Sequence, residues 1–236
     1  MIENIFSVAF QFLVNLPSLN FADLITPIIL FPTIFYLIIR SMEYRLYQSI
    51  YISAGLLTLA LSSFIRLYVT ISMEWSSTLF ISFFLLVRLH PAIISYALLD
   101  VYGEGRYGYY KKVYIIYLGF TLSILTIYAL IGSLKTFLLE TESYPLVVES
   151  GEMTTLKYFI DLPSTAIILF STLKYFSFNH SRYDTLLILF AYLTWFIGVN
   201  IYGLGIIGLY GIAEIISSIL YSLGSIVFLK NISNSL

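Results

Sequence analysis

Five ionisable residues inside otherwise apolar stretches are the side chains of this chain best suited to chemistry. They are Arg66, Arg88, His90, Asp161 and Glu214. An ionised side chain at the centre of a bilayer costs about 3 kcal/mol or more unless it is paired or faces water. Each of these residues is therefore a candidate for binding a ligand, an ion or a proton. Because two arginines stand against two acids, the same residues can instead form ion pairs that fix helix register.

Neighbouring side chains extend this set into a predicted pocket. Tyr192 and Trp195 are expected to form its aromatic wall, and Asn200 lies near the end of the same stretch. At about 1.5 Å per helical residue, Arg88 falls near the middle of its stretch and Glu214 a few residues outward of the middle. We therefore predict a ligand or ion pocket in the outer half of the protein, formed by Arg88, Glu214, Asp161, Arg66, His90, Tyr192, Trp195 and Asn200.

The last apolar stretch also carries a polar stripe at helical spacing, which comprises Tyr210, Glu214, Ser217, Ser218, Tyr221 and Ser225. A weaker stripe in the fifth stretch comprises Lys157, Asp161, Ser164, Thr165 and Thr172. Polar side chains avoid lipid, so the two stripes are expected to face each other or a wet cavity. Serine and threonine also bond to their own helix backbone, which accounts for part of the stripe but not for Glu214.

The elements that must position these residues are apolar stretches long enough to cross a membrane. The chain of 236 residues is 59% hydrophobic and only 11% charged, whereas soluble domains carry about 25% charged residues. A transmembrane helix needs roughly 20 mostly apolar residues. The sequence predicts one all-α integral membrane domain over 1–236, a bundle of seven transmembrane helices at 21–39, 49–71, 76–99, 113–131, 156–176, 185–202 and 206–229.

Charges in the connections predict the orientation of the bundle. Basic residues occur in alternate connections, as Arg40, Arg45, Arg106, Lys111, Lys112, Lys174, Arg182 and Lys230. The long connection over residues 132–155 contains four glutamates and one lysine. Because cytoplasmic loops carry the excess of lysine and arginine, we expect the N-terminus outside and the C-terminus in the cytoplasm. The predicted location is the cell membrane, with a membrane or cytoplasmic partner protein at the basic inner loops.

Several classes of protein are excluded or disfavoured. The chain has no cysteine, so disulfides, thiolate catalysis and cysteine-ligated metals are excluded. It has only two histidines, and His180 lies in a connection, so neither a bis-histidine haem nor a metal site is expected. No common hydrolase or phosphate-binding motif occurs, which favours a non-enzymatic role. A net charge of −1 argues against a nucleic-acid partner.

Short motifs in the last third of the chain resemble those of microbial rhodopsins. Ser164-Thr-Ala166 is similar to a run in the fifth helix of that family, and Trp195-Phe-Ile-Gly198 resembles the aromatic stretch of its sixth helix. The resemblance implies a seven-helix bundle with the N-terminus outside. Retinal needs a lysine in the middle of the last helix, and that position falls at Ser222 here. Lys230 is the only lysine of the last stretch and lies at its end, so no retinal cofactor is expected.

Three functions follow from this pattern. The first is a non-enzymatic receptor or binding protein with a charged outer-side pocket for a small ligand or ion. The second is a secondary transporter or proton-coupled carrier in which Glu214 is the titrating group. The third is a structural subunit of a larger membrane complex, in which the charges only hold helices together. A carrier needs polar residues that continue from the pocket to the inner side, which the last stretch provides but the third stretch hardly does.

Overall fold

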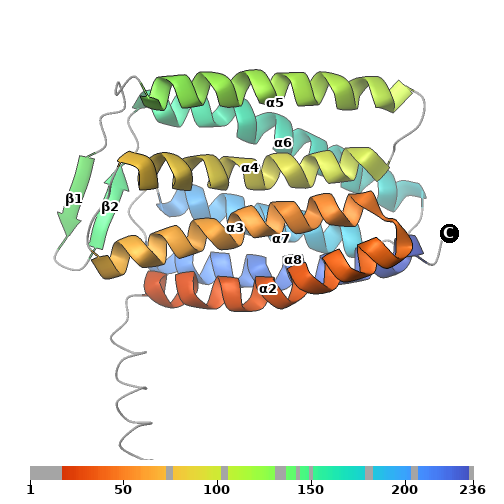
Figure 1. Cartoon of the computed structure of the whole chain (residues 1–236), viewed down its shortest axis with the longest axis horizontal. Helices are drawn as coiled ribbons and strands as arrows, with labels where there is room; N and C mark the ends of the chain where they lie inside the picture. The colour runs from red at the N-terminus through yellow and green to blue at the C-terminus, as the bar shows by residue number, and fades with distance from the viewer. Residues whose placement is uncertain are drawn as a thin grey trace, which may run out of the picture.

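In the part of the chain that it describes, the computed structural model has seven helices and one small hairpin (Figure 1). It describes residues 18–72, 77–101, 106–130, 137–141, 144–148, 151–178, 183–202 and 207–233. The helices are α2 (Ser18–Tyr44), α3 (Tyr47–Ser72), α4 (Ser77–Val101), α5 (Arg106–Leu130), α6 (Gly151–Phe178), α7 (Tyr183–Tyr202) and α8 (Ile207–Ser233). Each predicted stretch therefore coincides with one helix. Residues 76, 131 and 206, at the ends of predicted spans, lie outside the described residues.

Most helices extend beyond the predicted stretches. The clearest case is α5, which begins at Arg106 rather than at residue 113. Hydropathy detects only the apolar part of a membrane helix, whereas the backbone hydrogen bonds continue into polar flanking residues.

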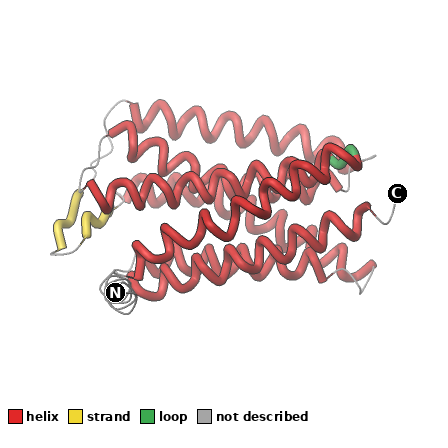
Figure 2. The backbone as a smooth tube through the Cα atoms, turned by 60° about the horizontal axis from the view of Figure 1, so that its bottom comes forward, coloured by secondary structure: helices red, strands yellow, loops and turns green. Residues whose placement is uncertain are grey.

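The long acidic connection contains a feature that the sequence analysis did not predict. Strands β1 (Phe137–Thr141) and β2 (Tyr144–Val148) pair in antiparallel fashion, with Phe137 opposite Val148 and Thr141 opposite Tyr144. The hairpin lies outside the bundle at one end of the helices (Figure 2). We name this the hairpin end, and it is where α2, α4, α6 and α8 begin.

The opposite end of the bundle is rich in cations, and we name it the basic end. The described basic residues there are Arg40, Arg45, Arg106, Lys111, Lys112, Lys174 and Lys230. A two-residue turn joins α2 to α3 at this end, and the Leu46 amide donates to the Ser41 carbonyl oxygen at 2.9 Å. Arg45 has φ 56°, the left-handed conformation that commonly terminates a helix. The short turn holds α2 and α3 side by side, so Asp23 on α2 lies near the far end of α3.

Neighbouring helices also approach closely at two glycines. A Cβ atom at Gly55 on α3 would lie 2.8 Å from Ile94 Cδ1 on α4. A Cβ atom at Gly198 on α7 would lie 2.8 Å from the Ala213 Cβ on α8. Small residues at such positions allow membrane helices to pack backbone to backbone.

The outer surface of the bundle is apolar and its interior contains many polar side chains. Phe35, Ile71 and Ile116 are 62%, 76% and 72% exposed, whereas both core arginines and several serines are buried. Five described helices, α2, α3, α4, α7 and α8, contain segments long and apolar enough to cross a membrane. Together these features indicate a membrane protein with lipid around the bundle.

Candidate functional site

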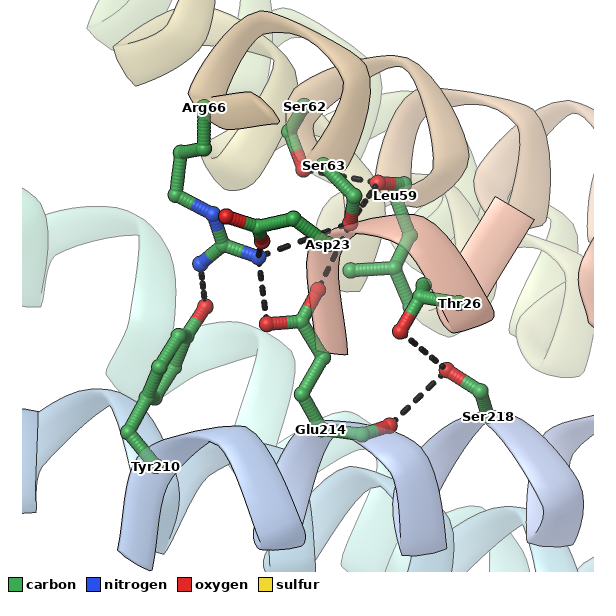
Figure 3. Close-up of polar contacts among 9 residues, drawn as sticks. All are labelled: Asp23, Thr26, Leu59, Ser62, Ser63, Arg66, Tyr210, Glu214 and Ser218. Atoms are coloured by element: carbon green, nitrogen blue, oxygen red, sulfur yellow. Dashed lines mark hydrogen bonds and ion pairs between the residues drawn. The ribbon is translucent and has the colours of Figure 1, made fainter. Parts of the chain in front are cut away.

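The Arg66 guanidinium on α3 lies between two carboxylates from different helices (Figure 3). Its Nη2 atom is 2.6 Å from Asp23 Oδ1 on α2 and also pairs with Glu214 Oε2 on α8. Its Nη1 atom donates to the Tyr210 hydroxyl, and its Cζ atom lies 4.8 Å from the centre of the same ring. We call Asp23, Ser63, Arg66, Tyr210 and Glu214 the Arg66 cluster, which joins α2, α3 and α8.

Hydroxyl groups complete the surroundings of Glu214. Ser63 Oγ on α3 donates to Glu214 Oε1 at 2.6 Å, and it also lies 3.2 Å from the Leu59 carbonyl oxygen. One helical turn along α8, Ser218 Oγ lies 2.8 Å from the Glu214 carbonyl oxygen and 3.4 Å from Thr26 Oγ1. Ser218 therefore links α8 to α2 just below the cluster.

The Arg66 cluster holds one carboxylate more than it holds cations among the described residues. Asp23 and Glu214 both have Arg66 as their ion-pair partner, and all three side chains are buried, with 0%, 1% and 6% exposure. Neither carboxylate oxygen of Asp23 has a hydrogen-bond partner in the described structure. The contact of Asp23 Oδ1 with Arg66 thus has the distance of an ion pair without the geometry of a hydrogen bond. Two buried carboxylates that share a single positive charge favour retention of one proton or cation.

A second ion pair joins α4 to α6. Arg88 Nη1 lies 2.5 Å from Asp161 Oδ2, and both side chains are buried. The Tyr192 hydroxyl on α7 lies 2.5 Å from Thr165 Oγ1 and 3.4 Å from the Asp161 carbonyl oxygen. The pair therefore forms part of a polar contact among three helices, with one arginine and one acid among the residues that the structure describes.

His90 on α4 forms a third polar contact, which joins α4 to α3 and α8. Its Nδ1 atom lies 3.1 Å from the Gly55 carbonyl oxygen on α3, and its Nε2 atom lies 3.1 Å from the Tyr221 hydroxyl on α8. A carbonyl oxygen can only accept, so Nδ1 carries the proton, and in the neutral ring Nε2 accepts from Tyr221. The ring also meets Trp195 of α7 edge to face, at 5.2 Å between ring centres.

Seven of the eight predicted pocket residues lie in three groups of contacts: Arg66 with Glu214, Arg88 with Asp161 and Tyr192, and His90 with Trp195. Of the two arginines and two acids that the sequence offered for ion pairs, Arg66 pairs with Glu214 and Arg88 pairs with Asp161. The depth of a residue along its helix can be estimated from the sequence, but the sequence does not show which helices pack against each other. In the fold α8 packs against α2 and α7, and α4 packs against α3 and α6.

Asn200 lies apart from the charged residues. Its Nδ2 atom donates to the Phe196 carbonyl oxygen at 2.8 Å on its own helix, and its Oδ1 atom accepts from the Tyr158 hydroxyl at 3.5 Å. This arrangement gives it a local role between α6 and α7.

Asp23, Ser63 and Tyr210 are the residues of the cluster that the predicted pocket did not include, and Asp23 is the charged one among them. It lies one turn into α2, where a carboxylate normally reaches the interface and attracts no attention. A second acid at the same predicted depth as Arg66 is the signal that could have identified it. In the part of the chain that the structure describes, no three aspartate, glutamate or histidine side chains gather as a metal site.

Comparison of the chain with protein-family models, curated proteins and solved structures finds no match. The resemblance to microbial rhodopsins accordingly stays a prediction, and the function must be argued from the geometry of the chain itself.

Proposed function

We propose that this chain is a multi-pass cell-membrane protein of seven spans that binds one proton at the Arg66 cluster. The hairpin end faces outside and the basic end faces the cytoplasm, as the positive-inside rule requires. The observation that carries the proposal is the pairing of Asp23 and Glu214 with one guanidinium. One shared proton makes the cluster electrically neutral, which is the favoured condition for a group buried at membrane depth.

A proton-coupled carrier is the function that we favour for this proton site. Buried hydroxyls continue from Glu214 along α8 toward the basic end, at Ser217, Ser222 and Ser225. Among the described residues, none of these three hydroxyls has a hydrogen-bond partner. Buried polar groups without a protein partner are satisfied by water or by a ligand. Such a row supports a path by which a proton passes from the cluster toward the cytoplasm.

The Arg88–Asp161 pair favours the structural subunit as a second candidate. This pair is balanced, buried and shared by two helices, as expected of an ion pair that fixes helix packing. If the Arg66 cluster behaved in the same way, the protein would need no proton. The sequence favoured a receptor with a charged pocket. To enter that pocket, a ligand would have to displace side chains that are already paired with one another in this structure.

Infrared spectroscopy tests the proton site directly. A shared proton gives a protonated carboxylic acid, whose carbonyl stretch shifts on exchange into heavy water. We expect this band in the wild-type protein at neutral pH and expect Glu214→Gln to remove it, because Asp23 then pairs one to one with Arg66. The matched control is Glu43→Gln, since Glu43 is exposed and pairs with Arg40 at 2.6 Å. A wild-type spectrum without the band would end the proposal.

Reconstituted liposomes then separate the carrier from other proton-binding proteins. An imposed pH gradient should acidify wild-type liposomes faster than liposomes containing Glu214→Gln. Glu43→Gln should match the wild type. Presence of the infrared band together with equal flux in all three preparations would exclude the carrier and leave a proton-sensing receptor.

A further inference from the structure

An apolar groove of about 740 Å³ lies between α5 and α6, apart from the polar contacts of the bundle core. Its volume falls in the range of roughly 300–1,000 Å³ that is typical of ligand sites. The side chains that form its two walls are Tyr110, Tyr114 and Tyr117 on α5 and Pro163, Ile167 and Phe170 on α6. In each helix these residues recur every three or four positions, so they share one face.

The floor of the groove is closed by hydrogen bonds between helices. The Tyr114 hydroxyl lies 2.5 Å from Ser95 Oγ on α4 and 2.9 Å from Ser164 Oγ on α6. These contacts satisfy the hydroxyl at the base of the groove, so the surface offered to an occupant is ring carbon and aliphatic side chain. An apolar chain fits this surface better than a polar molecule does.

The mouth of the groove is open to the surroundings of the bundle. Tyr110 and Phe170 are 59% and 53% exposed, one on each wall. The bundle is surrounded by lipid, so the groove is continuous with the acyl chains of the bilayer. Between Pro163 and Phe170 it extends about 10 Å at the helical rise per residue. The hydrocarbon core is about 30 Å thick, so the groove covers only about a third of the length of a transmembrane helix, a length that matches part of one acyl chain.

A cation lies where the groove reaches the basic end. Lys174 follows Phe170 by one helical turn on the same face of α6, and its Nζ atom lies 5.8 Å from the Phe170 ring centre. On the other wall Lys111 pairs with Asp100 and lies 5.2 Å from the Tyr96 ring centre. Neither lysine lines the groove itself, but Lys174 lies just beyond its basic end, one turn after the lining residue Phe170. An apolar groove ending in a cation complements a molecule with an apolar chain and an anionic head.

We propose that the groove between α5 and α6 binds an anionic phospholipid, with one acyl chain between the tyrosines and Phe170 and the phosphate at Lys174. This inference is independent of proton binding, since no residue of the Arg66 cluster lines the groove. The lipid fills the space beside α5 and fixes that helix against α6.

Native mass spectrometry tests the proposal on the full chain, with phosphatidylglycerol and phosphatidylcholine supplied in equal amounts. We expect the wild type to retain phosphatidylglycerol in preference. Lys174→Gln should lower the ratio of the two retained lipids about five-fold, the effect of one basic side chain at an anionic membrane surface. The matched control is Lys230→Gln, because Lys230 lies at the same end on α8, away from the groove. Equal ratios in the two variants would overturn the assignment of the headgroup.

A second variant tests the acyl chain. Val113 lines the groove from α5, and Val113→Trp places a large ring in the space. It should lower the amounts of both lipids retained while the thermal stability in detergent stays near that of the wild type. Unchanged retention of both lipids would overturn the proposal, as would cross-linking of two copies through α5 in the membrane.

Discussion

Replacement of the two carboxylates of the Arg66 cluster by amides, singly and together, gives a result that depends on whether they share a proton. Glu214→Gln keeps the shape of the side chain. The new amide oxygen can accept from Arg66, and the amide nitrogen can donate to Ser63 Oγ, which then donates to the Leu59 carbonyl oxygen. Asp23 remains to neutralise Arg66. We therefore expect Glu214→Gln to change the free energy of unfolding by less than about 1 kcal/mol.

The double replacement is expected to behave very differently. In Asp23→Asn/Glu214→Gln, Arg66 loses both carboxylates with which it pairs at a buried position. Removal of the opposite charge from a buried ion costs about 3–5 kcal/mol. The double variant should therefore lose about 3–5 kcal/mol, although each single variant loses about 1 kcal/mol or less. This non-additivity is the coupling of two residues that serve one partner.

Reversible unfolding in mixed detergent micelles measures these differences, with circular dichroism as the signal. Glu43→Gln is the control for replacement of an exposed, paired carboxylate by an amide, and it should lie within about 0.5 kcal/mol of the wild type. The opposite outcome is that each single variant loses about 3–5 kcal/mol, as expected when one buried ion pair is broken, and that the two losses add. This outcome would refute the shared proton. That outcome would mean that both carboxylates are ionised, and the cluster would then be a structural ion pair.

Further predictions concern pH, a second ion pair and helix packing. Above about pH 5 the carboxylates of the unfolded chain have lost their protons, whereas the folded cluster is proposed to keep one. The free energy of unfolding should therefore fall by about 1.4 kcal/mol for each unit of rising pH. Thermal unfolding at several pH values measures this slope, and Glu214→Gln should remove it. Arg88→Met should lower the free energy of unfolding by about 3–5 kcal/mol because it leaves Asp161 buried without its arginine. Arg88→Met/Asp161→Leu should lower it much less because the second change removes that acid. Chemical unfolding of both variants checks this, and equal losses would contradict it. Gly198→Ala should cost about 1–3 kcal/mol because its new Cβ meets a Cβ atom of α8 at 2.8 Å. Gly119→Ala, which meets nothing within 4 Å, should raise the melting temperature slightly, and equal melting shifts in the two variants would contradict the packing.

The helices of this fold could be predicted closely from the sequence, because the bilayer sets their length and composition. The stretch 49–71 became α3 over Tyr47–Ser72, and 185–202 became α7 over Tyr183–Tyr202. The prediction of a membrane protein is confirmed by the five helices that are long and apolar enough to span. The hairpin was missed because its short strands lie in a connection where hydropathy carries no signal.

The pairing of charges could not be predicted in the same way. Arg88 and Glu214 have suitable charges and similar depths, yet they lie on helices that do not pack against each other as principal neighbours. The choice between Arg66 and Arg88 as partner of Glu214 depends on which of their helices lies near α8, and α2 brings α3 there because it packs against both α3 and α8. Since α2 packs against α8, Asp23 and Glu214 meet across almost the full length of the chain.

The same contact explains how a proton at the Arg66 cluster can affect a distant part of the bundle. Arg66 and Gly55 both lie on α3, and Glu214 and Tyr221 both lie on α8. His90 accepts from Tyr221 and donates to the Gly55 carbonyl oxygen, so it bridges the same two helices about 10 Å further along α8. On the proposed proton site, loss of the proton leaves two buried negative charges at one arginine, Asp23 on α2 and Glu214 on α8, and their repulsion is relieved if α8 moves away from α2. Because the short turn holds α3 beside α2, α8 then also moves relative to α3. That movement must change the His90 contacts. His90 therefore reports the protonation of the cluster, and Glu214→Gln should abolish the pH dependence of the His90 ring resonances in nuclear magnetic resonance spectra.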